Sequence, residues 1–175
     1  MKLHPVPSAL LLCAAALLAG CATRSPAPAA SAAPAAAAAP TYDHTEPLGA
    51  AMEGWAYPFP VQHLQFELEG RPVRMAYMDV QPTAAPNGQT VVLFHGKNFG
   101  SDYWANTLRA LPAKGYRVIV PHLRGYGSTR FLSAQTPRNG EPAALASDVL
   151  NLLDALHIPR ANLAGFDWGA RSADI

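Results

Sequence analysis

Three short apolar runs, separated by longer amphipathic segments, constrain the fold of this chain more than any other feature. They cover residues 90–96, 116–121 and 161–167. Each run is almost continuously apolar, as is typical of strands that are buried on both faces in parallel sheets. Strands that alternate with helices predict a mainly parallel sheet with helices on both faces.

The segments between these runs have the pattern of helices. One helix is expected from Ser101, a favourable N-cap residue, to Gly115. A second is expected within residues 144–159, and a third begins at Trp168. Five residues form one apolar stripe along the second helix: Leu145, Val149, Leu152, Leu153 and Leu156.

Two alternating runs precede the first apolar run. Apolar and polar residues alternate in residues 64–69 and again in residues 73–77, on either side of Gly70. This pattern predicts an antiparallel hairpin. The expected fold class is therefore α/β, with an antiparallel hairpin leading into a mainly parallel sheet with flanking helices, over residues 62–175.

The N-terminal part of the chain is expected to lie outside this domain. Residues 1–20 combine a positive start at Lys2 with an apolar run, residues 9–20. This run of about a dozen residues is shorter than the roughly 20 that span a bilayer, but it fits a secretory signal peptide. Residues 22–40 are rich in alanine and proline, so residues 21–61 are expected to form a tether without a packed core.

The apolar run ends in residues 18–21, Leu-Ala-Gly-Cys, which resemble the lipobox of bacterial lipoproteins. The resemblance implies a cleaved signal peptide and lipidation of Cys21, and an ordinary signal peptide is the alternative. Several acyl chains would anchor the chain more firmly than one. Because Ala22 is not the aspartate associated with inner-membrane retention, the resemblance implies an exported protein anchored to the outer membrane and facing the periplasm.

Charge and cysteine content exclude other classes. The net charge is +1 with no basic block, so no footprint for nucleic acid is present. Of the two cysteines, Cys13 lies in the predicted signal peptide, which leaves Cys21 alone and excludes a disulfide within the mature chain and a cysteine metal site. We expect a small-molecule substrate, no cofactor and no metal, and the oligomeric state stays open.

The candidate functional residues follow the three apolar runs. His95, Gly96 and Lys97 end or follow the first run, the loop from Arg124 follows the second, and Asp167 ends the third. Ligands of such sheets bind beyond the carboxyl ends of the strands. We therefore expect these residues to meet at one site.

Residues 165–169, Gly-Phe-Asp-Trp-Gly, have the small-x-nucleophile-x-small pattern of a nucleophile elbow, a strained turn between a strand and a helix. Gly165 and Gly169 leave room beside the nucleophile. A serine needs a neighbouring base, whereas an aspartate with a pKa near ~3.9 is already anionic at neutral pH. Carboxylate attack on an acyl carbon would give a reactive anhydride, but attack on a saturated carbon gives an ester that water can cleave.

From about Leu64 to Ile175, the chain resembles the N-terminal half of an α/β-hydrolase. Its "GFDWGA" element resembles the branch with an aspartate nucleophile, the epoxide hydrolases and haloalkane dehalogenases. The resemblance implies that Asp167 is the nucleophile and that the backbone N–H groups of Trp168 and Lys97 form the oxyanion hole. In dehalogenases the matching indole also helps to hold the halide.

The resemblance further implies that His95 and Gly96 shape the oxyanion loop and that His95 is not the catalytic base. Lys97 and Asn98 stand where dehalogenases carry a halide-binding asparagine and epoxide hydrolases usually carry "HGxP". A dehalogenase with this sequence would therefore lack one of its halide ligands. An epoxide hydrolase would lack only a proline of the turn and no catalytic atom. His122 replaces the family's usual aspartate and is expected to be structural.

The family places its acid, its catalytic histidine and its lid after the nucleophile helix. The resemblance therefore implies that residues 1–175 are a fragment of a longer hydrolase, inactive or nearly so alone, with the nucleophile strand exposed at a sheet edge. Two alternatives to an epoxide hydrolase-like enzyme stay open. One is a haloalkane dehalogenase-like hydrolase, and the other is a catalytically dead domain with a binding or structural role.

Overall fold

The computed structural model describes residues 47–52, 54–68 and 70–175. The predicted signal peptide, the lipidation of Cys21 and the tether as far as residue 46 lie outside the described residues, so these remain predictions. In the described ranges, no helix is both long enough and apolar enough to cross a bilayer.

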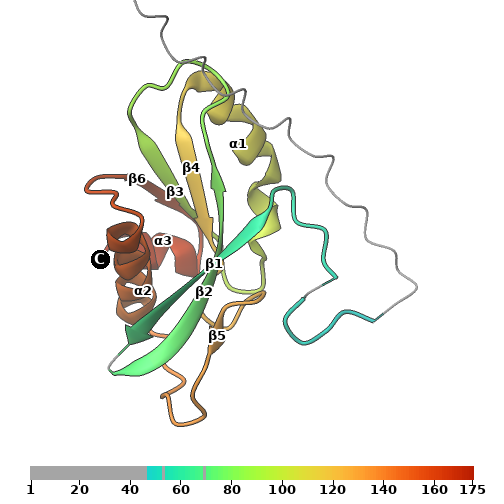
Figure 1. The fold of residues 1–175 in the computed structure, drawn as a ribbon, viewed down its shortest axis with the longest axis vertical. Helices are drawn as coiled ribbons and strands as arrows, with labels where there is room; N and C mark the ends of the chain where they lie inside the picture. Colours follow the sequence, from blue (N-terminus) through green and yellow to red (C-terminus); the bar gives the residue numbers. More distant parts are fainter. Residues whose placement is uncertain (1–46, 53, 69) are drawn as a thin grey trace, which may run out of the picture. The chain divides into compact units, whose positions relative to one another are not determined.

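The described residues form a six-stranded sheet in which the main path runs β1-β2-β4-β3-β6 and the short β5 pairs with β2 (Figure 1). The predicted hairpin is confirmed, with β1 antiparallel to β2. The predicted parallel part is confirmed as well, since β3 runs parallel to both β4 and β6. The strands are β1 (Val61–Leu68), β2 (Arg71–Val80), β3 (Thr90–Phe94), β4 (Arg117–Pro121), β5 (Arg130–Phe131) and β6 (Asn162–Gly165).

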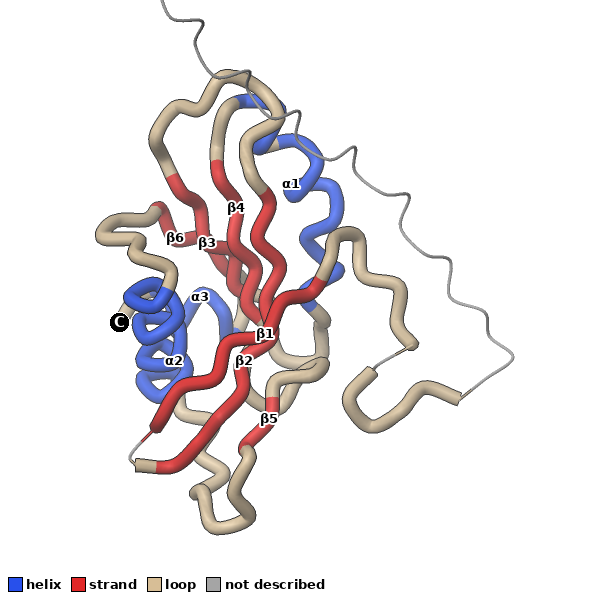
Figure 2. Tube along the Cα trace, viewed as in Figure 1, coloured by secondary structure: helices blue, strands red, loops and turns tan. Residues whose placement is uncertain are grey.

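Helices cover both faces of the sheet (Figure 2). The segment that begins at Ser101 consists of a 3₁₀ turn to Trp104, helix α1 (Ala105–Ala110) and a second 3₁₀ turn, Pro112–Lys114. Gly115 ends this segment in the left-handed conformation with φ 86°, as glycine readily does. Helices α2 (Pro142–Ala155) and α3 (Trp168–Ala173) complete the layers.

Two apolar cores lie on opposite faces of the sheet because successive residues of a strand point to opposite sides. The predicted stripe of α2 packs on one face against alternate residues of the central strands, and Leu108 of α1 packs on the other. The first core includes Met75, Tyr77, Val92, Phe94, Ile119, Val149 and Leu152. The second includes Met78, Val80, Val91, Leu93, Leu108, Val118 and Val120.

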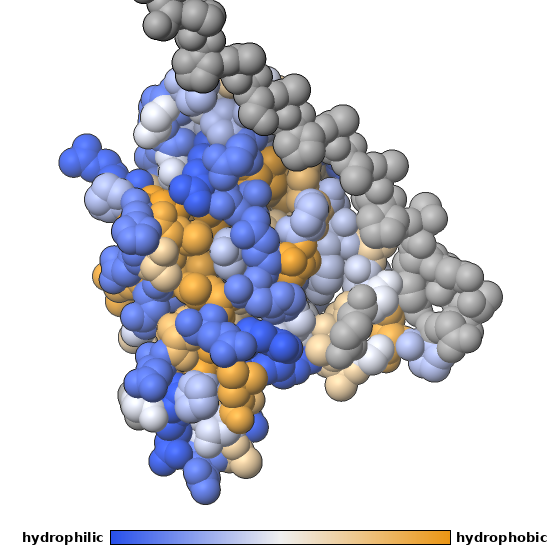
Figure 3. Space-filling model, in the orientation of Figure 1, coloured by the Kyte–Doolittle hydropathy of each residue, from blue (hydrophilic) through white to orange (hydrophobic). Residues whose placement is uncertain are grey.

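The two outer strands are more exposed than the central ones. On β1, the apolar side chains of Leu64, Phe66 and Leu68 are half-buried and alternate with exposed ones. Figure 3 shows small apolar areas between polar ones on the face viewed there. Strand β6 has a sequence of the buried type, but it lies at the edge of the sheet and Leu163 is 46% exposed. The expected edge position of the nucleophile strand is confirmed.

A buried ion pair joins the loop after β4 to α2. The Arg124 guanidinium donates two hydrogen bonds to the Asp148 carboxylate, both 2.7 Å long, and further ones to the carbonyl oxygens of Asn139 and Ala144. Burial raises the pKa of Asp148, and the hydrogen bonds from Arg124 act in the opposite direction. The pair therefore fixes the loop after β4 against the start of α2.

Candidate active site

Asp167 occupies a strained turn between β6 and α3. Its backbone has φ 53° and ψ −125°, a conformation that residues with a side chain rarely adopt. Strain of this kind persists only where the surrounding structure enforces it, and it is concentrated at functional sites. The sharp strand-to-helix turn therefore has the geometry of a nucleophile elbow, and it presents an exposed carboxylate.

Two backbone N–H groups interact with this carboxylate. Lys97 donates a hydrogen bond to Oδ1 of Asp167 at 2.7 Å, and Trp168, the first residue of α3, is the second donor. The hydrogen bonds from Trp168 and Lys97 lower the pKa of Asp167 below its ordinary value of 3.8. The side chain is thus a pre-positioned anion at neutral pH, and its two donors are the N–H groups that the family resemblance implies.

The glycines of the elbow are needed because backbones approach closely around it. A Cβ atom on Gly165 would lie 2.6 Å from the carbonyl carbon of Gly169, and one on Gly169 would lie 2.5 Å from the carbonyl oxygen of His95. Each neighbour is main chain, which cannot swing aside as a side chain can. The expected close approach at both glycines is confirmed.

Substituting Gly165 or Gly169 with alanine should therefore destabilise the domain by about 1–3 kcal/mol, the usual cost of overpacking. Urea unfolding followed by circular dichroism measures this loss. Gly140→Ala is the matched control, since a Cβ there would have no heavy atom within 4 Å. Equal stability of the Gly140 and Gly169 variants would contradict the packing described.

His95 supports the loop that carries Lys97. Its ring is fully buried, and Nε2 accepts a hydrogen bond from the backbone N–H of Leu123 at 3.0 Å. Nδ1 must then carry the ring hydrogen, which it donates to the carbonyl oxygen of Gly96, also at 3.0 Å. Burial lowers the pKa of His95, so the ring is neutral. With both nitrogens engaged, the ring ties the β3 loop to the β4 loop and is not available as a base for Asp167.

His122 is buried in the loop after β4 and is 1% exposed. It packs against the ring of Tyr57, with 4.7 Å between ring centroids. Burial, with smaller contributions from His95 and His63, lowers the pKa of His122 to about 3. The imidazole is therefore neutral at physiological pH, and it gains a positive charge only in acid solution.

The buried neutral state of His122 predicts acid sensitivity. Between pH 6.5 and about 3, the unfolded chain binds a proton at this residue that the folded chain does not. The contribution to stability is complete above pH 6.5 and is lost as the pH falls, by at most about 5 kcal/mol. His122→Asn should flatten the slope of unfolding free energy against pH, whereas His157→Asn, at an exposed histidine, should not. Parallel slopes for His122→Asn and the wild type would contradict this assignment.

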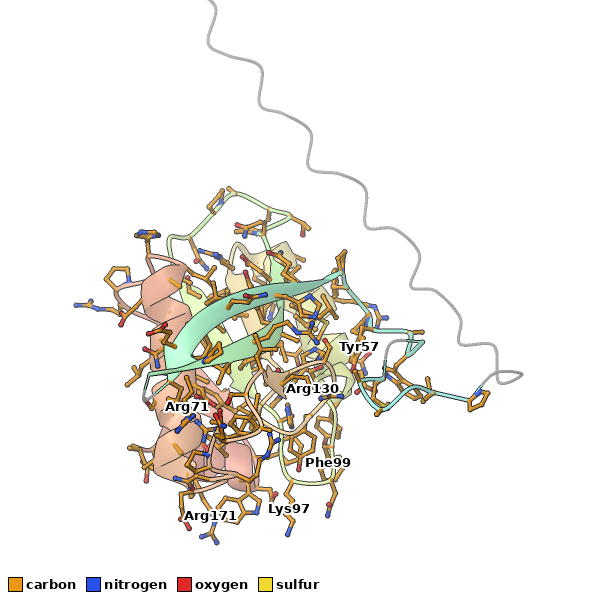
Figure 4. All side chains as sticks on the ribbon, turned by 60° about the horizontal axis from the view of Figure 1, so that its bottom comes forward. Tyr57, Arg71, Lys97, Phe99, Arg130 and Arg171 are labelled. Carbon is orange, nitrogen blue, oxygen red and sulfur yellow. The ribbon has the colours of Figure 1, made fainter. Side chains whose placement is uncertain are left out.

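An aromatic cluster lies next to the nucleophile. The ring of Phe166 packs against Phe99, Tyr103 and Trp104, with centroids 5.1, 4.7 and 5.8 Å apart. Phe99 is 44% exposed and Tyr103 58% exposed, which is unusual for large rings. In Figure 4, Lys97 and Phe99 lie at the same end of the domain. Sequence reasoning missed this cluster, although three aromatic residues soon after "HG" were a visible signal.

A cavity of about 280 Å³ opens beside the donors of the elbow. Gly96, Lys97, Tyr126 and Trp168 line it, together with residues near the start of α2. The indole of Trp168 lies under the guanidinium of Arg171, 5.6 Å from the ring centroid. Within the described residues, no group of three or more His, Cys, Asp or Glu side chains is arranged to hold a metal ion.

Comparison with known proteins agrees with this geometry. The model of the "alpha/beta hydrolase fold" family matches residues 89–173. A candidate epoxide hydrolase from Klebsiella pneumoniae subsp. pneumoniae superimposes with a TM-score of 0.56 and 51% identity, covering 65% of this chain and 36% of that one. This part of the chain has the α/β-hydrolase fold. A candidate hydrolytic enzyme from Pseudomonas aeruginosa PAO1 matches this α/β-hydrolase domain with a TM-score of 0.59 and 35% identity, over 74% of this chain and 38% of that one.

The α/β-hydrolase domain is also similar in sequence to epoxide hydrolases. An epoxide hydrolase from Caballeronia sordidicola is 38% identical over 86 residues, which make up 49% of this chain and 26% of that protein. The chain therefore spans well under half the length of the relatives it matches. The expected fold class and the expected similarity to epoxide hydrolases are confirmed.

Proposed function

We propose that this α/β-hydrolase domain provides the nucleophile of an epoxide hydrolase-like enzyme, with Asp167 attacking a saturated carbon of an epoxide ring. The supporting observation is an ionised carboxylate at a strained turn, in contact with the N–H groups of Lys97 and Trp168. The similarity to proteins named epoxide hydrolases supports the same substrate class.

The proposed reaction follows from the two oxygens of one carboxylate. One oxygen stays on the backbone donors while the other forms a bond to the ring carbon. The carbon–oxygen bond of the ring breaks, and its electron pair goes to the ring oxygen, which then takes a proton from a water molecule. The product is an ester of Asp167 whose carbonyl oxygen faces Lys97 and Trp168. When water attacks this carbonyl, the same N–H groups stabilise the negative charge, and collapse releases a diol.

Hydrolysis of the ester needs a base that activates water. The histidines among the described residues are His63, His95, His122 and His157, and none hydrogen-bonds to Asp167. His95 and His122 are buried and neutral, and His63 pairs with the hydroxyl of Ser128 on another part of the sheet. The described residues should therefore form the ester but hydrolyse it slowly.

The test is intact mass spectrometry of the chain after incubation with styrene oxide or, separately, with 1-bromohexane. The proposal predicts one stable adduct with the full mass of the epoxide, because addition expels nothing. Alkylation by the bromide at a higher rate, with stoichiometric halide release, would favour a dehalogenase-like nucleophile. No adduct with either reagent would overturn the nucleophile role and leave a binding or structural domain.

The lowered pKa of Asp167 predicts how this reaction depends on pH. The carboxylate is the reactive form, and its backbone hydrogen bonds keep the pKa below 3.8. The initial rate of adduct formation should therefore be nearly constant from pH 8 to pH 5 and should fall only in more acidic solution. Rates measured by quenched-flow mass spectrometry check this. A rate that rises through pH 6–7 would indicate a different nucleophile, such as a histidine.

A further inference from the structure

A second cavity, of about 400 Å³, lies beside the loop that carries Lys97 and has no part in the reaction proposed for Asp167. Three parts of the chain enclose it: residues 50–52 and 54–57 before β1, residues 98–102 after β3, and residues 122–127 after β4. Its volume falls within the range of about 300–1,000 Å³ that is typical of small-molecule sites.

Aromatic rings from all three segments line this cavity. Trp55 and Tyr57 come from the first segment, Phe99 from the second and Tyr126 from the third. The Tyr126 hydroxyl accepts a hydrogen bond from the backbone N–H of Asn98, which fixes its ring between the two loops. The faces of aromatic rings carry negative partial charge and therefore attract cations.

The formal charge of the lining is negative. Asp102 is the only charged residue among the lining residues, all of which are described, and no hydrogen bond or ion pair to its carboxylate is found within the described part of the chain. Its negative charge is felt inside the cavity, since it adds to burial in raising the pKa of Tyr57. The neighbouring Arg130, which donates hydrogen bonds to the carbonyl oxygens of Gly127, Thr129 and Ala50, acts on the pKa of Tyr57 in the opposite direction, but its effect is smaller than that of Asp102.

Ser101 and His122 are the two buried polar residues at the wall of the cavity. Oγ of Ser101 and Nε2 of His122 make no hydrogen bond, although the two residues are only 2% and 1% exposed. Since the His122 ring is neutral, it does not oppose a positively charged occupant.

We propose that this cavity binds a small organic cation, with an alkylammonium group held between the aromatic rings and the Asp102 carboxylate. The methyl or methylene groups next to the nitrogen contact the ring faces of Trp55, Tyr57 and Phe99. Phe99 also packs on Phe166 of the elbow, and Asp167 is not among the lining residues, so the bound molecule does not contact Asp167.

The test compares choline with 3,3-dimethylbutan-1-ol, a neutral molecule of the same shape in which carbon replaces nitrogen. Binding to the whole chain is followed by calorimetry and by the fluorescence of its tryptophans. The proposal predicts saturable choline binding that is at least about tenfold tighter than binding of the neutral alcohol. A tenfold ratio of dissociation constants corresponds to about 1.4 kcal/mol of binding free energy. Equal affinities, or no saturable binding of choline, would overturn it.

Two variants locate the site. Asp102→Asn should weaken choline binding about tenfold and leave the weak binding of the neutral alcohol unchanged. Asp154→Asn, at an exposed aspartate of α2, is the matched control and should bind choline as the wild type does. If both variants lose affinity equally, or neither does, choline does not bind at Asp102 and the proposal fails.

Folding and the Asp167 reaction are checked separately. Circular dichroism and a thermal melt show whether Asp102→Asn remains folded, and Trp55→Leu gives a second variant that removes one ring without a charge change. Both variants should still form the styrene oxide adduct at the wild-type rate, because that reagent is neutral. Loss of choline binding with an unchanged rate of adduct formation supports the cavity as the choline site. If the wild type forms no adduct, that result bears only on the role of Asp167.

Discussion

Replacing Asp167 with asparagine should lower the rate of epoxide adduct formation at least about 10³-fold. The amide has nearly the same shape and keeps an oxygen that can accept the hydrogen bond from Lys97, so the elbow should be preserved. What it lacks is the negative charge that makes the carboxylate a nucleophile. The initial rate of mass increase with styrene oxide measures the effect.

The control for this variant is Asp174→Asn, which removes another exposed carboxylate at the end of α3. Asp174 has an ordinary backbone conformation, with φ −95°, and its side chain makes no hydrogen bond among the described residues. This variant should react at the wild-type rate. If both variants react equally fast, the adduct does not depend on the elbow.

Replacing Arg124 with methionine should cost about 3–5 kcal/mol of unfolding free energy, the usual result when one partner of a buried ion pair is removed. The side chains of Arg124 and Asp148 are each only 6% exposed. Without the guanidinium, the Asp148 carboxylate remains buried with no counter-charge, and two carbonyl oxygens lose their donor. Urea unfolding at pH 7 measures the loss.

The Arg117–Asp79 pair provides the comparison. It has the same 2.7 Å contact, but the Arg117 side chain is 26% exposed, and Asp79, itself 8% exposed, keeps a hydrogen bond from Gln81. Arg117→Met should therefore cost less than Arg124→Met, about 1–2 kcal/mol. The double variant Arg124→Met with Asp148→Leu should recover much of the stability lost with Arg124 alone, because it removes the unpaired charge. Equal losses for the Arg124 and Arg117 variants would contradict the role of burial.

The sequence predicts the order and type of the main elements because their signals are local. Residues 90–96, 116–121 and 161–167 each contain a strand of the sheet, and the stripe along α2 packs as expected. The segment from Ser101 departs from a regular helix, since both of its ends form 3₁₀ turns. The two-residue β5 was not predicted because so short a strand leaves no periodic pattern.

The elbow was predictable for a related reason. Its glycines and Asp167 are close in sequence, and their spacing predicts the turn because a buried strand precedes them and a helix follows. The ion pair of Arg124 with Asp148 and the packing of Phe166 on Phe99 join residues 24 and 67 positions apart. Such contacts depend on how the loops fold over the sheet. An aspartate within the apolar stripe of α2 was the one signal that a buried partner existed.

Peptide mapping of the adduct tests the nucleophile most directly. Trypsin should release residues 161–171 as one peptide, in which Asp167 is the only carboxylate side chain and no histidine, lysine or cysteine is present. The account predicts that the epoxide-derived mass lies on this peptide, that fragmentation places it on Asp167, and that mild alkali removes it as expected for an ester. An adduct on any other peptide, with residues 161–171 unmodified, would contradict the assignment of Asp167 as the nucleophile.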